Sequence, residues 1–349
     1  MTRVPGSMPK MICDFFCNSN FLQGMTITNK SIKIFLNRVL GPVLFVWLSY
    51  TVYRQMLKQP NLNQCVVYIK EALYGPLAWK FWLAILLMFF NWMIEAGKWR
   101  ILLKSLESVS LGHAFKAVVA GLAFAFGTPN RIGEYGGRAL YISEGKRMQS
   151  VSLTVVGSFS QLLVTLCFGC LGLLFIKNNV IKNHSWAMII QWGMYAVTLF
   201  FGLLYFRLNW ISEFAQRIRI PQKFIRHFMI LNEVTVTILL RVLCLSALRY
   251  FVFLAQYILL LDVMHVHAGL WNAFWLITVL YLILAVVPTM ALLELGIRGK
   301  AGVLLFQTFS TNTVGIYAAS TGIWLVNLVL PALAGGLLTL THKIFNTKQ

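Results

Sequence analysis

Six stretches of the chain are long and almost purely apolar, and each has about the 20 residues that an α-helix needs to cross a bilayer. They are residues 34–53, 77–95, 151–176, 186–206, 235–261 and 316–340. We expect helices, because backbone groups in lipid must find their hydrogen-bond partners within the segment. Hydrophobic residues make up 58% of the chain and charged residues 11%, against about 45–50% and 25% in soluble domains. The predicted fold class is an all-α polytopic membrane protein with about six full spans.

The formal net charge of +20 has a simple interpretation in such a chain. Lys and Arg of membrane proteins collect in cytoplasmic loops, where they set the orientation and meet anionic headgroups. The spans use up the length, so no basic domain is left to bind nucleic acid. With both termini in the cytoplasm, the strongest basic clusters fall on one side, and only the basic loop 54–80 is against this. We expect a multi-pass protein of the bacterial cytoplasmic (inner) membrane.

The N-terminal residues 1–30 are predicted to be a tail, with disorder as one alternative, and residues 31–349 a single transmembrane domain. The sequence after Met25 also reads as a natural start, so translation from Met1 and from Met25 both stay open.

Two regions interrupt the pattern of full spans. The apolar run 111–127 is too short to cross a bilayer, and a polar segment and a short polar helix follow it to about residue 147. The apolar run 270–287 is stopped by Pro288, since proline cannot continue a helix. Each region has the pattern of two half-length helices around a break. We therefore expect two re-entrant hairpins, at about 111–147 and 269–308, that enter from opposite sides as inverted repeats with their tips near the midplane.

The first break is the sequence GTPNRIGEYGGR, residues 127–138. Gly127 can end the incoming helix, while Thr128 and Pro129 are typical of the N-cap and first turn of the outgoing one, and Gly133 belongs to the same tip. Three charged side chains then share one face of the outgoing helix, at spacings of three and four residues that allow them to pair. They are Arg131, Glu134 and Arg138.

The second break follows Pro288 and repeats the chemistry of the first in a different order. Glu294 and Arg298 are four residues apart, which allows a pair on one helix face. Gly296 and Gly299 are expected to permit close approach of a neighbouring segment.

A charge at the centre of a bilayer costs about 2.5–3.5 kcal/mol on insertion scales. Apolar residues can often replace a buried ion pair without loss of stability, so stability alone explains these five charges poorly. A polar cavity at the two tips explains them better, because helix N-termini and guanidinium groups suit an anion such as a phosphate. Two plainer alternatives stay open: pairs that lock the broken helices together, or charges at the membrane interface. Glu95, near Lys98, is interpreted as an interfacial anchor rather than a substrate contact.

No cofactor or metal site is expected. Cys167 and Cys170 lie in an apolar run and are interpreted as core residues, the cysteines lack zinc-ligand spacing with histidine, and the chain has no phosphate-binding G-x-x-x-x-G-K-[ST] sequence.

The segment TPNRIGEYGGRALYI resembles the P-G-R-x-G-E-x-x-R signature of the transmembrane region of lysylphosphatidylglycerol synthases, a flippase-like family. ALLELGIRGKAGVLLF is similar to the family's second, glycine-rich signature, and KWRILL fits its pattern after an early span. The chain departs from the family at Asn130, where glycine is common, and at Glu294, which precedes its arginine; Lys300 stands nearby. No soluble synthase domain is expected in this chain, so the resemblance implies the membrane part alone: translocation of an anionic or aminoacylated lipid, or of a lipid-linked precursor.

The function expected is therefore lipid translocation without enzymatic activity, with the phosphate held by Arg131, Arg138 and Arg298. Glu134 and Glu294 orient those arginines, contact a cationic part of the headgroup or carry a coupling proton, and Lys300 completes the expected substrate-binding set. The expected partners are the lipid and the membrane, with a homo-oligomer as an open possibility. The alternatives are an intramembrane lipid-modifying transferase, a small-solute or ion transporter, and a membrane scaffold.

Overall fold

The structure is a computed structural model, and it describes residues 70–126, 128–180, 185–208, 227–287 and 291–341, together with Tyr50, Val67, Trp210 and Glu213. The regular structure in these ranges is helical, and no strand occurs among them. The all-α class is confirmed to that extent.

Five helical stretches are long and apolar enough to cross a membrane, and each coincides with an expected span. They are α5 (Ala78–Leu103), α8 (Arg147–Val180), α9 (Ser185–Phe206), α12 (Val236–Val263), and the run from α15 (Thr313–Trp324) through the π-helical turn η4 (Leu325–Val329) to α16 (Leu330–Thr341). The sixth expected span, 34–53, lies outside the described residues apart from Tyr50, and so do the tail 1–30 and the end of the chain.

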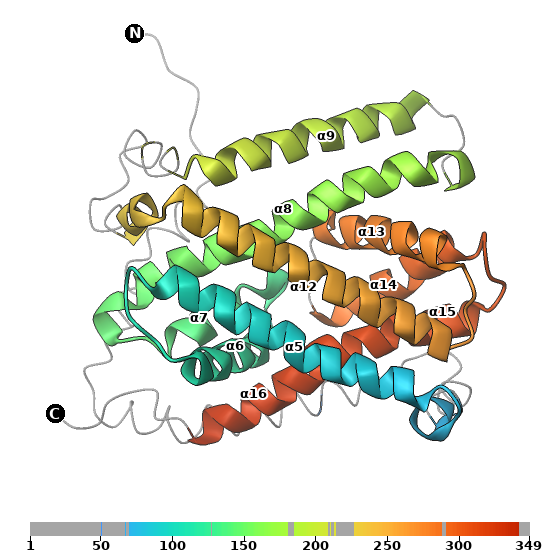
Figure 1. Ribbon diagram of the computed structural model, residues 1–349, viewed down its shortest axis with the longest axis horizontal. Helices are drawn as coiled ribbons and strands as arrows, with labels where there is room; N and C mark the ends of the chain where they lie inside the picture. Colours follow the sequence, from blue (N-terminus) through green and yellow to red (C-terminus); the bar gives the residue numbers. More distant parts are fainter. Residues whose placement is uncertain are drawn as a thin grey trace, which may run out of the picture.

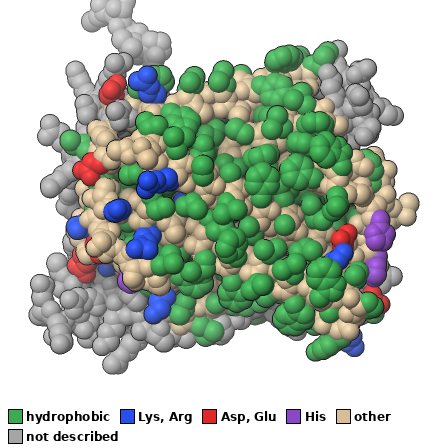
Figure 2. Space-filling view, viewed as in Figure 1, with side chains coloured by type: hydrophobic (Ala, Val, Ile, Leu, Met, Phe, Trp, Pro, Cys, Tyr) green, Lys and Arg blue, Asp and Glu red, His purple; other side chains and the backbone are tan. Residues whose placement is uncertain are grey.

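The helices α5, α8, α9 and α12 run lengthwise through the molecule (Figure 1). Hydrophobic side chains cover the middle of the face shown in Figure 2, while charged and histidine side chains gather toward its two ends. Most of the Lys and Arg side chains on this face lie toward the left end, where α5 stops. An apolar belt between two polar ends is what contact with lipid acyl chains requires.

Both expected breaks are present. In the first region α6 (Leu111–Ala125) is followed by a short 3₁₀ turn, η1 (Pro129–Arg131), and by α7 (Gly133–Ala139), which packs against α6. In the second, α13 (Leu270–Val286) ends before Pro288, and α14 (Ala291–Phe306) packs against both α13 and α15. Figure 1 places α6 and α7 toward one end of the molecule and α13, α14 and α15 toward the other.

The polar helix of the first region is shorter than expected. It ends at Ala139 rather than near residue 147, and the separate 3₁₀ turn η2 (Glu144–Lys146) leads into α8. A further 3₁₀ turn, η3 (Met229–Glu233), precedes α12. Three helices, α6, α12 and α15, begin at side-chain caps. The side chains of Ser110, Thr235 and Asn312 accept hydrogen bonds from the backbone N–H groups three residues later in the sequence.

Helix α5 extends beyond the expected end at Glu95 to Leu103. The sequence places the boundary at the first charge, but Glu95 and Lys98 are both buried, with 3% and 1% of their surface exposed. The helix continues through them because their charges are paired inside the protein, as described below.

The π-helical turn η4 has a cause in the sequence. Pro331, in the first turn of α16, lacks an N–H group and its ring clashes with the carbonyl four residues earlier. The backbone widens over 325–329, and a widened turn of this kind often marks a functional site. Asn327, in the middle of the turn, lines the cavity described next.

Candidate functional site

The backbone at the first break turns because two residues adopt the left-handed conformation. Asn130 has φ 48° and Arg131 has φ 58°, a region that asparagine enters more readily than most other side chains. Thr128 ties the two half-helices together: its Oγ1 accepts from the Gly133 N–H at 2.8 Å and donates to the Ala125 carbonyl at 3.2 Å. Thr128 therefore binds the first N–H group of the outgoing helix from across a turn, but the N-cap position that was expected for Thr128 is occupied by Ile132.

This turn overturns one expectation about Arg131. A continuous helix would put Arg131 on one face with Glu134 and Arg138, but α7 begins only at Gly133. The left-handed backbone takes Arg131 out of the helix. Its Nη2 instead donates to Glu294 Oε2 at 2.9 Å, across 163 residues of sequence. The two breaks are thereby joined directly.

Glycines allow α6 and α7 to pack at backbone contact. A Cβ added at Gly133 would lie 2.2 Å from the Phe124 carbonyl oxygen, and one at Gly137 would lie 2.9 Å from the Gly121 Cα. No side chain fits in those positions, so the hairpin depends on them. The close packing fixes where α7 presents Glu134 and Arg138 to the interior.

We call Arg131, Glu294 and Arg298 the cavity cluster. Arg298 Nη2 donates to Glu294 Oε1 at 2.6 Å, which confirms the expected pair four residues apart on α14. The two oxygens of Glu294 thus each accept from a different arginine. The Arg131 side chain is 37% exposed and that of Arg298 is 12% exposed, so both guanidinium groups lie at the boundary of the protein interior.

The cavity cluster lines a cavity of about 570 Å³. Further polar groups on its wall come from Gln161 and Thr165 of α8 and from Asn327 of η4, and aromatic side chains include Tyr250 of α12 and Tyr281 of α13. One stretch of the wall, Leu284 to Val287 at the end of α13, is apolar, and Val286 and Val287 there are 54% and 37% exposed. The wall of the cavity thus combines the charged side chains of the cavity cluster with an exposed apolar edge.

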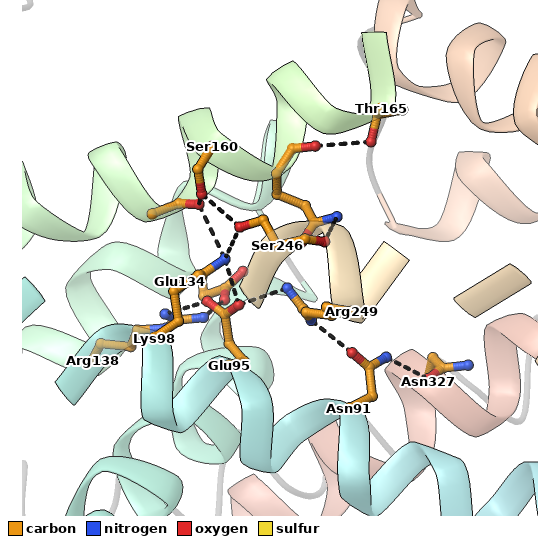
Figure 3. A network of polar contacts seen from close by, with 12 residues as sticks. Asn91, Glu95, Lys98, Glu134, Arg138, Ser160, Thr165, Ser246, Arg249 and Asn327 are labelled. Atoms are coloured by element: carbon orange, nitrogen blue, oxygen red, sulfur yellow. Dashed lines mark hydrogen bonds and ion pairs between the residues drawn. The ribbon is translucent and has the colours of Figure 1, made fainter. Parts of the chain in front are cut away.

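A second group of charges lies deeper, and Figure 3 shows it from close by. We call it the buried cluster; its members are Glu95, Lys98, Glu134, Arg138 and Arg249. Glu95 is its centre: Oε1 accepts from Arg138 at 2.9 Å, and Oε2 contacts Arg249 at 2.7 Å and Lys98 at 2.8 Å. Arg138 also pairs with Glu134, as the spacing of four residues predicts.

The buried cluster is closed off by hydrogen bonds to its surroundings. Lys98 Nζ donates to the Gly157 carbonyl at 3.1 Å and to Ser246 Oγ at 3.3 Å, and Ser246 in turn contacts Ser160 Oγ at 2.7 Å. Arg249 Nε donates to Asn91 Oδ1 at 2.8 Å. Charges in a medium of low dielectric require such partners, and Arg138 Nε is the one donor of the cluster that has none among the described residues.

The two clusters are linked through the wall of the cavity. The amide of Asn91, which accepts from Arg249, donates to Asn327 Oδ1 at 3.4 Å. The Arg249 guanidinium also lies 4.8 Å from the ring centre of Trp92, a cation–π distance, and Trp92 lines the cavity. A change in the cavity can therefore reach the buried cluster through few contacts.

The remaining expected site residues fall in different places. Lys300 is exposed, and the cavity wall does not include it. Gly296 does not hold a close contact: apart from its chain neighbours and the backbone of its own helix, no atom of the described residues lies within 4 Å of a Cβ built there, whereas Gly299 packs against the Tyr317 ring. Gly127 and Pro288 lie outside the described residues, and Pro129 begins η1.

The sequence interpretation missed the centre of the buried cluster. Glu95 does pair with Lys98, but inside the protein rather than as an interfacial anchor. Lys98 and Arg249, the latter inside the expected span 235–261, are not among the site residues that the sequence predicts. A signal existed, since an arginine within an apolar span is costly and marks a partner or a site.

The described residues contain no group of three or more histidine, cysteine, aspartate or glutamate side chains that could hold a metal ion. Apolar helices of membrane-spanning length around a charged, cavity-bearing interior define a multi-pass membrane protein.

Residues 38–338 match the family described as the lysylphosphatidylglycerol synthase TM region, so the chain belongs to this family. Searches of curated proteins and of solved structures returned no match. The membership suggests a membrane lipid-related function, which covers both lipid transfer between leaflets and lipid modification.

Proposed function

We propose that the protein is a lipid translocase, not an enzyme, that moves an anionic or aminoacylated phospholipid or a lipid-linked precursor between leaflets. One observation carries the proposal: the cavity joins two arginines that share one carboxylate to an apolar edge that is exposed on the outside of the helices. A lipid has the same two-part chemistry, a polar headgroup and apolar chains.

The proposed binding of the lipid headgroup rests on the two arginines of the cavity cluster. Each guanidinium carries five N–H donors, and Arg131 and Arg298 each direct one of them to Glu294. The donors that remain suit the oxygens of a phosphate, which arginine binds in a forked geometry. Glu294 orients both groups.

The proposed contact with the acyl chains of the lipid rests on the C-terminal end of α13. Leu284 to Val287 line the cavity, and Val286 and Val287 also face outward. In a bilayer such an edge lets acyl chains stay in lipid while the headgroup enters the cavity. A transporter of small solutes would not need an opening of this kind, since its substrate arrives from water.

The placement of the two breaks supports a mechanism of alternating access. If α6 and α7 form one re-entrant hairpin and α13 and α14 the other, related as inverted repeats, the contact of Arg131 with Glu294 joins their tips. Rocking of one repeat against the other would open the cavity to one leaflet at a time. We place the basic end of the molecule, and both termini, in the cytoplasm of a bacterial cell with the protein in the inner membrane.

The proposal is tested in vesicles that contain the purified protein and fluorescent lipids, by measuring how fast the label in the inner leaflet becomes accessible to an external quencher. The wild-type protein should accelerate exchange, and Arg131→Gln, Glu294→Gln and Arg298→Gln should reduce it. Absence of exchange over a panel of anionic, zwitterionic and aminoacylated lipids would overturn the proposal. Formation of a modified lipid that depends on Mg²⁺ or Mn²⁺ would favour the transferase instead.

A further inference from the structure

We infer that the headgroup is a phosphate with two negative charges, such as a phosphomonoester. This inference rests on the proposed function and narrows its substrate. It starts from the charge balance of the interior. The cavity cluster and the buried cluster together hold five side-chain cations and three carboxylates, an excess of two positive charges.

The rest of the chain does not supply the missing negative charges. Only ten acidic residues occur in the sequence, and three are in the clusters. Three others pair elsewhere, Glu71 with His265, Glu107 with Lys146 and Asp262 with Lys80. Glu144, Glu213 and Glu233 are exposed, and Asp14 lies outside the described residues. A single aspartate cannot balance two charges.

The excess is accessible from the cavity. The buried cluster is enclosed, but the cavity cluster is at the wall, and the Arg131 side chain is 37% exposed there. An uncompensated charge in a low-dielectric region is costly, and a bound anion removes that cost. A dianion balances the interior fully, and a monoanion balances half of it. A headgroup with a net positive charge, as an aminoacyl group gives to phosphatidylglycerol, would increase the excess.

Unpaired donors at the wall point to the same chemistry. Three cavity residues have a buried N–H or O–H group without a hydrogen-bond partner among the described residues: the Trp92 indole, the Tyr250 hydroxyl and Arg298 Nε. Such groups cost free energy while unpaired. The oxygens of a phosphate dianion are strong acceptors that these donors can reach if the side chains turn toward the cavity.

The test compares headgroups in neutral phosphatidylcholine vesicles at pH 8, where a phosphomonoester carries about two charges because its second pKa is about 6. Four tail-labelled lipids are used: phosphatidic acid, phosphatidylglycerol, phosphatidylethanolamine and lysylphosphatidylglycerol. Exchange of the phosphomonoester should be about tenfold faster than that of phosphatidylglycerol, since one more charge-assisted contact forms. Exchange of another lipid without this preference would overturn the inference and leave the translocase proposal standing.

Charge-changing variants locate the preference. Arg298→Gln lowers the excess at the cavity by one, so exchange of phosphatidic acid should fall toward that of phosphatidylglycerol. Arg241→Gln makes the same change at an exposed position of α12 and should keep the preference. Equal effects of the two variants would assign the preference to the overall charge of the protein and overturn the inference.

Binding in detergent decides the inference even if no lipid is exchanged. Thermal unfolding is measured with short-chain phosphatidic acid, short-chain phosphatidylglycerol or inorganic phosphate at equal concentration. We expect the largest rise in Tm with phosphatidic acid, and its loss in Arg298→Gln. An equal rise with inorganic phosphate would keep the dianion site but overturn the lipid as its source, and an equal rise with phosphatidylglycerol would overturn the dianion.

Discussion

The cavity cluster and the buried cluster use the same side chains for different purposes. In the buried cluster one carboxylate, Glu95, contacts three cations, and serine and asparagine groups take up further donors. In the cavity cluster Glu294 contacts two arginines that keep unused donors at an open wall. The first arrangement is enclosed, with Arg138 Nε as its one buried donor without a partner among the described residues, whereas the second lies open at the cavity wall, where we propose that a ligand binds. Access from the cavity, rather than residue type, distinguishes the cluster that we interpret as structural from the one that we interpret as a binding site.

The largest effect is expected from Glu95→Gln. The substitution removes the negative charge that three buried cations share, and breaking a buried pair costs about 3–5 kcal/mol. Thermal unfolding in detergent should show a large fall in Tm or a loss of monodisperse protein. Glu71→Gln, at a side chain that is 53% exposed, is the control and should change the Tm little. A Glu95→Gln protein of wild-type Tm would contradict the structural role of the buried cluster.

Glu294→Gln should have the opposite profile. Water in the cavity can reach Arg131 and Arg298 when the carboxylate is lost, so the fall in Tm should be smaller than for Glu95→Gln. The lost hydrogen bonds to charged groups are worth about 1.5–3 kcal/mol each, so lipid exchange should slow by about 10–100-fold. The measurement is the vesicle exchange assay together with thermal unfolding. The comparison of the clusters fails if this variant loses stability and keeps its exchange rate.

The third prediction concerns the hairpin that contributes to both clusters. A Cβ at Gly133 would lie 2.2 Å from the Phe124 carbonyl oxygen, so Gly133→Ala must push α7 away from α6. Overpacking of this kind costs about 1–3 kcal/mol. Both the Tm and the exchange rate should fall, because Arg131 and Arg138 lie on either side of the substitution. Gly136→Ala is the matched control, since a Cβ added there meets no atom of the described residues within 4 Å beyond its chain neighbours and its own helix backbone. Similar losses in both variants would refute the packing argument.

Local spacing predicted much of this architecture. The five apolar spans within the described residues, the breaks near Pro129 and Pro288, and the pairs Glu134–Arg138 and Glu294–Arg298 all follow from patterns within a few residues. These features depend on helix periodicity and on proline, which act over one or two turns.

The contacts that assemble the site were not predictable in this way. The pairs of Arg131 with Glu294 and of Arg249 with Glu95 join residues 163 and 154 positions apart, and no local pattern encodes them. The left-handed backbone at Asn130 and Arg131 changed the direction of one arginine, and the helical spacing had assigned it the wrong partner. Two residues decide that direction, so a small error in local conformation became an error in the site.

The smallest effect is expected from Lys300→Gln. The sequence places Lys300 with the headgroup contacts, two residues after Arg298, but the structure leaves it exposed and off the cavity wall. A surface substitution away from packed or paired groups usually changes stability by no more than about 0.5 kcal/mol. The Tm should stay close to that of wild type and the exchange rate within about twofold of it, while Arg298→Gln, the same change of charge two residues earlier on α14, should reduce exchange strongly. If the two variants behave alike, the charge on α14 acts through its distance from the lipid surface rather than through contact in the cavity. The difference between the cavity cluster and the buried cluster would then have no functional consequence.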